Sequence, residues 1–336
     1  MERAYTMSTV YVICPANAVT GGPELLHQLV KALNDADRPA FIVYAPFSAR
    51  HQVPAAYAQY NIPVAQRSDI EPGSEVVIPE MWPAMIDRFP GCRINFWWLS
   101  VDNFFSLLIH HRIRRLLPKA VENLAQRILK SRALRQVRRA NRHLYQSEYA
   151  RLFLEEIGLA PTRRLGDYIN KDYLDLIGAP LSSPRRDIVA YNPAKGRERA
   201  VAVINALKMK VGDSITAVPI VNMSRSEVRE LLATSKVYMD LGHHPGKDRI
   251  PREAAAAGAC VLVNCRGSAG NPVDVPVSDF YRIDDTGPDF ASEAASKIVE
   301  IIGDFDAHRR SFDDYRRRIA DEPSEFIEDA QRAFSS

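Results

Sequence analysis

The residues best suited to chemistry lie at positions 240–264, in the stretch DLGHHPGKDRIPREAAAAGACVLVN. Its pattern predicts the end of a strand, a polar loop, a short helix that opens with Arg252 and Glu253, and a second strand. Three cations stand near the start of this helix: Lys247, Arg249 and Arg252. The dipole and the unpaired N–H groups of a helix N-terminus favour an anion, and the cations add to that preference. The stretch therefore predicts a phosphate-binding loop.

A second candidate is the loop with Thr20, Gly21 and Gly22, between an apolar run and a helical pattern. Glycines at the start of a helix let the backbone approach a ligand closely. The GxGxxG spacing of a dinucleotide site is absent. We expect Gly21 and Gly22 to contact a ligand, and the alternative is a tight structural turn.

A carboxylate follows the apolar run RINFWW, in the segment WWLSVDN at positions 97–103. In parallel α/β sheets, ligands bind at the carboxyl ends of the strands. Asp102 is therefore placed to accept a proton or to bind a sugar hydroxyl. The alternative is that Asp102 caps the next helix, a position that aspartate favours.

Lys195 follows another apolar run, in the segment YNPAKG at positions 191–196. A lysine at the start of a helix is unfavourable for the helix dipole, so its presence there indicates another role. We expect Lys195, with Asn192 in the same loop, to hold a diphosphate.

No metal site and no disulfide is expected. His243 and His244 have no third ligand at a matching spacing. The four cysteines are Cys14, Cys92, Cys260 and Cys265. They show no metal spacing, and three lie in or beside expected strands, so buried free thiols are predicted. With no apolar run of bilayer length and no signal-peptide pattern, we expect a cytoplasmic protein.

One segment is strongly basic. Between His110 and His143 there are eleven Lys or Arg residues and one acid, while the net charge of the whole chain is +3. Apolar positions at helical spacing predict a helix here. Such a helix can lie on an anionic membrane surface or bind a phosphorylated acceptor. The alternatives are a solvated helical face and a nucleic-acid site, and interleaved aromatic residues that would favour the latter are missing.

Strands that alternate with helices must position these loops. The apolar runs lie at 9–14, 40–46, 75–80, 93–100 and 141–147, then at 187–193, 214–221, 236–242 and 259–264. Helical patterns between them predict an α/β protein with parallel, doubly wound sheets. The pattern restarts after the linker-like LSSPRR at 181–186. Two Rossmann-like domains are therefore expected, at 1–180 and 187–322, with a final amphipathic helix at 323–336.

The arrangement resembles the glycosyltransferases of the GT-B fold, in particular the family-4-like retaining group, over nearly the whole chain. The family has a glycine loop before its first helix, which residues 21–26, GGPELL, match. It has a lysine–glycine pair after the first strand of its second domain, matched by Lys195 and Gly196. Its segment E-A-x-A-x-G-x-x-V is matched by residues 253–261. The resemblance implies two Rossmann domains that face a cleft, with the last helix crossing back onto the first domain.

The resemblance also implies roles for single residues. In the family, the glutamate of that segment binds the nucleotide ribose, a role carried over to Glu253. The lysine binds the donor diphosphate, a role carried over to Lys195. The nucleobase meets the backbone after a strand, which falls here at Ile220 and Val221. Gly22 would let the first loop approach the donor phosphates.

The chain departs from the family pattern at three places. Pro245 stands where the family commonly has a second glutamate, which touches the donor sugar. Near Asn192 the arginine that often accompanies the diphosphate lysine is missing, and Arg249 is expected to replace it. After the fourth strand the family often has a histidine, where this chain has Ser100 and Asp102.

These features predict a metal-independent glycosyltransferase, hexosyl- or related, that needs no cofactor. It would move a sugar from a nucleotide-diphosphate sugar to a glycan or lipid-linked acceptor in surface polysaccharide or glycoconjugate synthesis. Lys195 and Arg249 would stabilise the leaving diphosphate, and Asp102 would orient the acceptor or act as base. Segment 110–143 would give peripheral membrane contact. The alternatives are a non-catalytic nucleotide-sugar-binding subunit, which Pro245 favours, and a basic α/β protein that binds membranes or nucleic acid.

Overall fold

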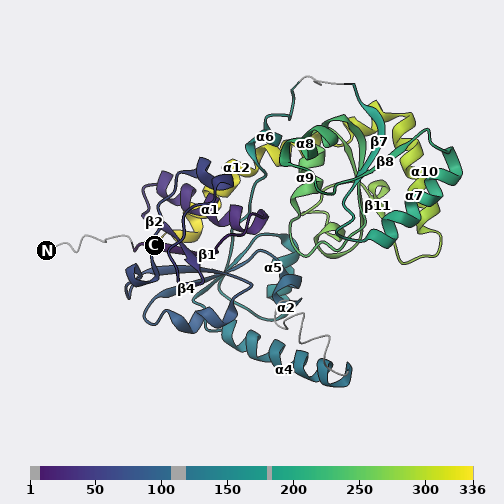
Figure 1. Ribbon diagram of the computed structural model, residues 1–336. Helices are drawn as coiled ribbons and strands as arrows, with labels where there is room; N and C mark the ends of the chain where they lie inside the picture. The colour runs from purple at the N-terminus through teal and green to yellow at the C-terminus, as the bar shows by residue number, and fades with distance from the viewer. Residues whose placement is uncertain (1–7, 107–118, 180–183, 336) are drawn as a thin grey trace. The chain divides into compact units, whose positions relative to one another are not determined.

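The computed structural model describes residues 8–106, 119–179 and 184–335 (Figure 1). These residues form two compact units. The first combines the residues up to Asp167 with those from Ser324 onward, and the second runs from Tyr168 to Pro323. The boundary between Asp167 and Tyr168 thus lies earlier in the chain than the linker expected at 181–186. Residues 181–183 of that linker lie outside the described ranges.

The first unit is built on a six-stranded parallel sheet with the strand order β2-β1-β3-β4-β5-β6. Its strands are β1 (Val10–Pro15), β2 (Ala40–Ala45), β3 (Glu75–Pro79), β4 (Arg93–Trp98), β5 (Arg142–Tyr145) and β6 (Thr162–Arg164). The first five coincide with predicted apolar runs. Strand β6, with the sequence TRR, was not predicted because it is a short edge strand without apolar residues.

Helices of the first unit follow its strands (Figure 1). They are α1 (Gly21–Asp35), α2 (Val101–Ser106), α4 (Lys119–Val137) and α5 (Glu148–Glu156), with the 3-10 turns η1 (Ala55–Tyr60), η2 (Arg67–Asp69) and η3 (Pro83–Arg88). Of the basic segment expected at 110–143, helix α4 covers 119–137 and β5 begins at Arg142, while residues 110–118 lie outside the described ranges. Ala133 and Val137 of α4 are buried, and Arg139 Nη1 lies 2.5 Å from Asp87 Oδ1 on η3.

A buried ion network lies at the amino ends of strands in this sheet. Glu75, the first residue of β3, is 3% exposed, and its Oε1 lies 2.9 Å from Arg38 Nη2. Its Oε2 accepts a hydrogen bond of 2.9 Å from Asn95 Nδ2 on β4 and lies 3.8 Å from Arg142 Nη1 on β5. The network joins the starts of three neighbouring strands.

The second unit is built on a five-stranded sheet with the order β11-β10-β9-β7-β8, and all of its pairs are parallel. Its strands are β7 (Arg186–Tyr191), β8 (Thr216–Pro219), β9 (Ser235–Asp240), β10 (Cys260–Asn264) and β11 (Arg282–Ile283). Its helices are α6 (Lys171–Leu174), α7 (Arg197–Val211), α8 (Arg225–Thr234), α9 (Arg249–Ala256), α10 (Phe290–Gly303) and α11 (Phe305–Arg310), with η4 (Gly267–Gly270) and η5 (Asp279–Tyr281). The predicted runs give β7 to β10. Strand β11, only two residues long, carries no run to detect.

The last helix, α12 (Asp313–Phe334), is longer than predicted. Pro323, where the sequence placed its start, lies inside it. A proline in a helix removes one hydrogen bond, so it is usually a boundary, but here the helix continues on both sides. Phe312, Tyr315 and Ile319, just before and within its first turns, belong to the core of the second unit.

The end of α12 belongs to the first unit. The Asp329 carboxylate accepts a hydrogen bond of 3.2 Å from the Gly166 N–H, and Glu325 pairs with Arg164 at 2.5 Å. Arg142, at the start of β5, donates to the Ala333 carbonyl oxygen. These contacts attach residues from Ser324 onward to the sheet that begins the chain.

All four cysteines are free, as predicted. Cys14 and Cys260 are buried and Cys92 is partly buried, but Cys265 is exposed because it lies just after the end of β10. In the described ranges, no helix combines the length and the apolar character that crossing a bilayer requires.

Candidate functional site

The segment singled out in the sequence forms the β9–loop–α9–β10 unit of the second sheet. Asp240 ends β9, and α9 begins at Arg249 with Asp248 as its N-cap. The helix therefore starts three residues before the predicted Arg252. Asp248 stands at the N-cap position without a side-chain capping hydrogen bond, and Pro251 is tolerated in the first turn. The cations predicted near the helix start lie within its first turn and the residues before it.

Two of these three cations are joined to an acid of α12. Arg252 Nη1 and Lys247 Nζ each lie 2.7 Å from a different carboxylate oxygen of Glu322. Arg252 is buried, and its guanidinium also donates to the main-chain oxygens of Lys247 and Asp248, at 3.2 and 3.3 Å. These bonds brace the loop before α9. Arg249 is half-buried beside them.

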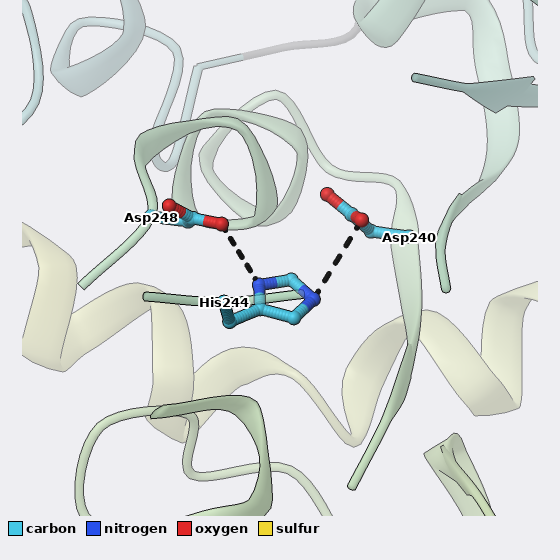
Figure 2. Close-up of side chains that lie close together, drawn as sticks. All are labelled: Asp240, His244 and Asp248. Carbon is cyan, nitrogen blue, oxygen red and sulfur yellow. Dashed lines mark ion pairs between the residues drawn. The ribbon is translucent and has the colours of Figure 1, made fainter. Parts of the chain in front are cut away.

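Lys195 and Asp248 connect two loops at the same edge of the sheet. Lys195 Nζ lies 2.8 Å from Asp248 Oδ2, yet the lysine side chain stays 36% exposed, so a ligand can still reach it. Asp248 Oδ2 also lies 3.0 Å from His244 Nδ1, and His244 Nε2 lies 3.6 Å from Asp240 Oδ1. Figure 2 shows the imidazole ring between the two carboxylates.

Burial and charge act against each other in this network. Burial raises the pKa of Asp240 above its usual value. Burial would also raise the pKa of Asp248, but the neighbouring His244 and Lys195 outweigh it and lower that pKa. Asp248 is therefore an anion that two cationic groups approach.

Glycines let these loops approach one another. Gly196 has φ +68°, and a Cβ there would overlap the Leu241 carbonyl. A Cβ on Gly242 would overlap the Cβ of Lys195, and a Cβ on Gly267 would overlap the His244 carbonyl. Lys195 is thus held against the β9–α9 loop by backbone packing as well as by its ion pair.

The other predicted residues of the second unit lie at the ends of adjacent strands. Asn192 follows β7, and its Oδ1 accepts a hydrogen bond of 3.0 Å from the Ala194 N–H. Ile220 and Val221 follow β8, and the Ile220 N–H donates to the main-chain oxygen of Tyr191 at 2.8 Å. Glu253 is half-buried in α9. Because β9, β7 and β8 are neighbours, the structure brings these residues to one edge of the sheet.

Gly21, Gly22 and Asp102 belong to the first unit. Both glycines lie in the first turn of α1. Asp102 lies inside the first turn of α2, and its carboxylate accepts from Tyr149 Oη at 3.3 Å. Ser100, and not Asp102, provides the capping acceptor at the start of α2: its Oγ accepts a hydrogen bond of 3.1 Å from the Asn103 N–H.

Sequence reasoning missed several buried acids at the same strand ends. Glu80 directly follows β3, accepts from the Leu99 N–H at 3.3 Å, and has its pKa raised by burial to about 8. Asp285, after β11, pairs with Arg199 at 2.7 Å and with Arg266 at 2.9 Å. Glu80 stands directly after β3 and Asp285 two residues after β11, which was the available signal, but their partners lie far away in the sequence.

Asp240, His244 and Asp248 each place one potential metal-ligand atom within 4.8 Å of the other two. Their arrangement does not suit a metal ion. The two carboxylates face different nitrogens of the ring, and Lys195 already lies against one of them (Figure 2). A metal would need one ring nitrogen and both carboxylates directed at the same point.

No family model matches this sequence, and no curated protein matches it. Solved structures do match. A glycosyltransferase from Rickettsia africae ESF-5 has a TM-score of 0.64 at 11% identity, with 98% of this chain and 98% of that chain covered. Sucrose-phosphate synthase from Thermosynechococcus elongatus has a TM-score of 0.60 at 13% identity, with 97% and 98% covered. The Anabaena protein HepE in complex with UDP has a TM-score of 0.63 at 13% identity, with 97% and 98% covered.

These neighbours are GT-B glycosyltransferases, and they match along nearly the full length of both chains. At such low identity the likeness concerns the fold. The chain has the GT-B fold, with parallel sheets of six and five strands, and this prediction from the sequence is confirmed.

Proposed function

We propose that this protein is a glycosyltransferase whose donor is a nucleotide-diphosphate sugar bound at the carboxyl edge of the second sheet. The observation that carries the proposal is the meeting of Lys195 with the β9–α9 loop, at the ends of adjacent parallel strands, in a GT-B fold. Ligands of such sheets bind at this edge. The UDP in the complex of the Anabaena neighbour supports a nucleotide donor.

The residues at this edge fit the parts of such a donor. Lys195 and Arg249 would hold the diphosphate and offset the charge that develops as it leaves, which is why the proposed reaction needs no metal and no cofactor. Glu253 would bind the ribose hydroxyls. The backbone at Ile220 and Val221 would contact the base, because main-chain groups there follow β8 at the same edge.

Lys247 and Arg252 take a supporting part in this proposal. Because Glu322 pairs with both, they shape the loop before α9, and the loop presents its N–H groups and Arg249. Gly246, next to Pro245, is buried, and its oxygen accepts from Ser268 Oγ at 2.5 Å. This hydrogen bond fixes the loop beside Pro245. Because residue 245 is a proline, no glutamate would contact the donor sugar from this position.

The first unit would bind the acceptor. Gly21 and Gly22 would approach the donor phosphates, and Asp102 would orient an acceptor hydroxyl or act as base. A retaining outcome and a role in surface polysaccharide or glycoconjugate synthesis follow from the family likeness. The exposed basic residues of α4 would favour a lipid-linked acceptor at an anionic membrane surface. Among the residues of α4 whose side chains are described, these are Arg127, Lys130, Arg132 and Arg135.

A panel of nucleotides and nucleotide sugars tests this function. Calorimetry with UDP, GDP and ADP should show binding of at least one, and the matching sugar nucleotides should release that diphosphate when glycan or lipid-linked acceptors are added. If none of the three nucleotides binds, the proposal is wrong. Binding without turnover on any acceptor would support the second candidate, a non-catalytic nucleotide-sugar-binding subunit, which Pro245 favours.

Sedimentation with vesicles tests the membrane part separately. Vesicles with anionic lipid should bind the protein, and binding should weaken when salt is raised, because the attraction is between exposed charges. Neutral vesicles are the control. Equal binding to both kinds of vesicle, or none, would contradict the role of α4, and binding to oligonucleotides instead would support a nucleic-acid site.

A further inference from the structure

His244 is fully buried at the centre of the charged network beside Lys195. Its main-chain oxygen accepts a hydrogen bond of 2.9 Å from the Ser268 N–H, which fixes its backbone. Its ring lies between Asp240 and Asp248, with one nitrogen toward each carboxylate (Figure 2). The family likeness gives this residue no role, and its burial excludes direct contact with a donor.

The two carboxylates require a particular protonation state of the ring. A neutral imidazole has one N–H and one acceptor nitrogen, so one nitrogen of His244 would face a carboxylate oxygen without a proton between them. An imidazolium has a proton for each side. Burial alone would lower the pKa of His244, but the contact with Asp248 and the charges of Asp240 and Asp248 raise it above its usual value.

Both carboxylates have further partners that keep them in place. Asp240 accepts from Tyr238 Oη at 2.8 Å and from the Gly242 N–H at 3.1 Å. Asp248 has Lys195 as its second cationic neighbour, at 2.8 Å. Among the described residues, the charged groups that act on His244 are the two carboxylates next to its ring, of Asp240 and Asp248, and the ammonium of Lys195 on the far side of Asp248.

The charge balance of this group depends on one proton. With His244 protonated, two anions and two cations compensate each other. With His244 neutral, one negative charge remains beside Lys195. That charge would hold the ammonium of Lys195 more strongly and would repel a diphosphate.

On the basis of the proposed function, we infer that His244 is a positioning residue of the donor site. As an imidazolium it compensates Asp248 and so leaves the Lys195 ammonium able to bind the donor diphosphate. The affinity for the nucleotide should therefore fall as the pH rises and His244 loses its proton.

Calorimetric titration with UDP, GDP and ADP from about pH 7 to about pH 9 tests this inference. The terminal phosphate, with a second pKa of about 6, is largely ionised over this range, and we expect wild-type affinity to fall roughly tenfold. In His244→Gln the affinity should be low and independent of pH. In Asp248→Asn it should also be independent of pH but no lower than that of the wild type at pH 7. Asparagine is nearly isosteric with aspartate and loses no capping hydrogen bond, since Asp248 makes none, while Lys195 loses its anion.

Three controls separate this role from a structural one. His243→Gln removes the neighbouring, exposed histidine and should keep the wild-type pH slope. Thermal melting should show that each variant is folded. In NMR spectra, the imidazole signal that His244→Gln abolishes should titrate above the usual histidine pKa of about 6.5.

The outcomes distinguish this inference from the function on which it rests. If no nucleotide binds the wild type at any pH, the proposed function fails and takes the positioning role with it. If a nucleotide binds but the slope persists in His244→Gln and Asp248→Asn, or His244 titrates below 6.5, only the positioning role is wrong.

Discussion

In the first unit the buried ion network lies at the amino ends of the strands, where Glu75 begins β3, whereas in the second it lies at the carboxyl ends, where Asp240 ends β9. The first network joins the buried Glu75 to Arg38, Asn95 and Arg142, and Arg93, which is exposed, lies 4.0 Å from its Oε1. The second ends in Lys195, whose side chain remains partly exposed.

Charges at the two ends of the strands therefore serve different purposes, stability at one end and ligand binding at the other. Ligands bind at the carboxyl edge of a parallel sheet, so a network at the amino edge can only brace the fold. At its own carboxyl edge the first unit has Glu80, whose raised pKa of about 8 leaves it mostly uncharged at neutral pH. The carboxyl ends of the first sheet thus carry a mostly uncharged acid, which suits a neutral sugar acceptor. Those of the second carry Lys195, which suits an anionic donor.

The largest effect is expected at the amino edge of the first sheet. Glu75→Ala leaves Arg38 and Arg142 without their buried carboxylate, which should destabilise the protein by about 3–5 kcal/mol. Urea denaturation measures the loss. Lys171→Ala, which breaks an exposed pair with Asp175, is the control and should cost less than about 1 kcal/mol. A similar cost for both variants would show that the buried network around Glu75 contributes no more to stability than an exposed ion pair.

A smaller effect, on binding alone, is expected at the carboxyl edge of the second sheet. Lys195→Ala should weaken nucleotide binding by about 2–3 kcal/mol because a charge-assisted contact with the diphosphate is lost. Its effect on thermal stability should be small, since the pair with Asp248 is partly exposed.

Lys236→Ala provides the matched control for Lys195. Lys236 lies near the start of β9 and pairs with Asp187 at 2.6 Å, so it is a lysine at the opposite edge of the same sheet. Calorimetry should find its nucleotide affinity unchanged. An equal loss in both variants would show that the carboxyl edge has no special part in binding.

The smallest effect concerns Glu80 and pH. Its folded pKa of about 8 lies above its value in the unfolded chain, so its contribution is fully present below about pH 4.5 and is lost as the pH rises toward 8. From about pH 5 to about pH 7 the wild type should lose ~2 kcal/mol relative to Glu80→Gln, whose amide cannot ionise. Denaturation at several pH values measures the difference, and parallel curves would show that Glu80 does not titrate in this range.

Local patterns were enough to predict most of the fold. Buried parallel strands appear in the sequence as apolar runs, and nine of the eleven strands in the described ranges were found in this way. The start of α9 at Arg249 was missed because the apolar pattern begins later than the N-cap at Asp248. Pro323 was misread because a proline usually ends a helix, while packing on both sides of it keeps α12 continuous.

The candidate site could be predicted only in part, because its residues are held by distant partners. Lys195 was found from its loop, but its contact with Asp248 depends on two strands being neighbours. No local signal links Lys247 and Arg252 to Glu322, about 70 positions away. From the sequence, His244 had no expected role once a metal site was set aside, because spacing alone cannot show that its two nitrogens face separate carboxylates.

The division of α12 between the units also bears on how the chain folds during synthesis. Residues 168–323 form one continuous unit, whereas the first unit needs both ends of the chain. Domains generally fold as they leave the ribosome. The second unit is therefore complete before the first receives Phe326, Ala330 and Phe334, which are buried in the finished protein. Until residues 324–336 emerge, the nascent first unit exposes the apolar surface that they will cover.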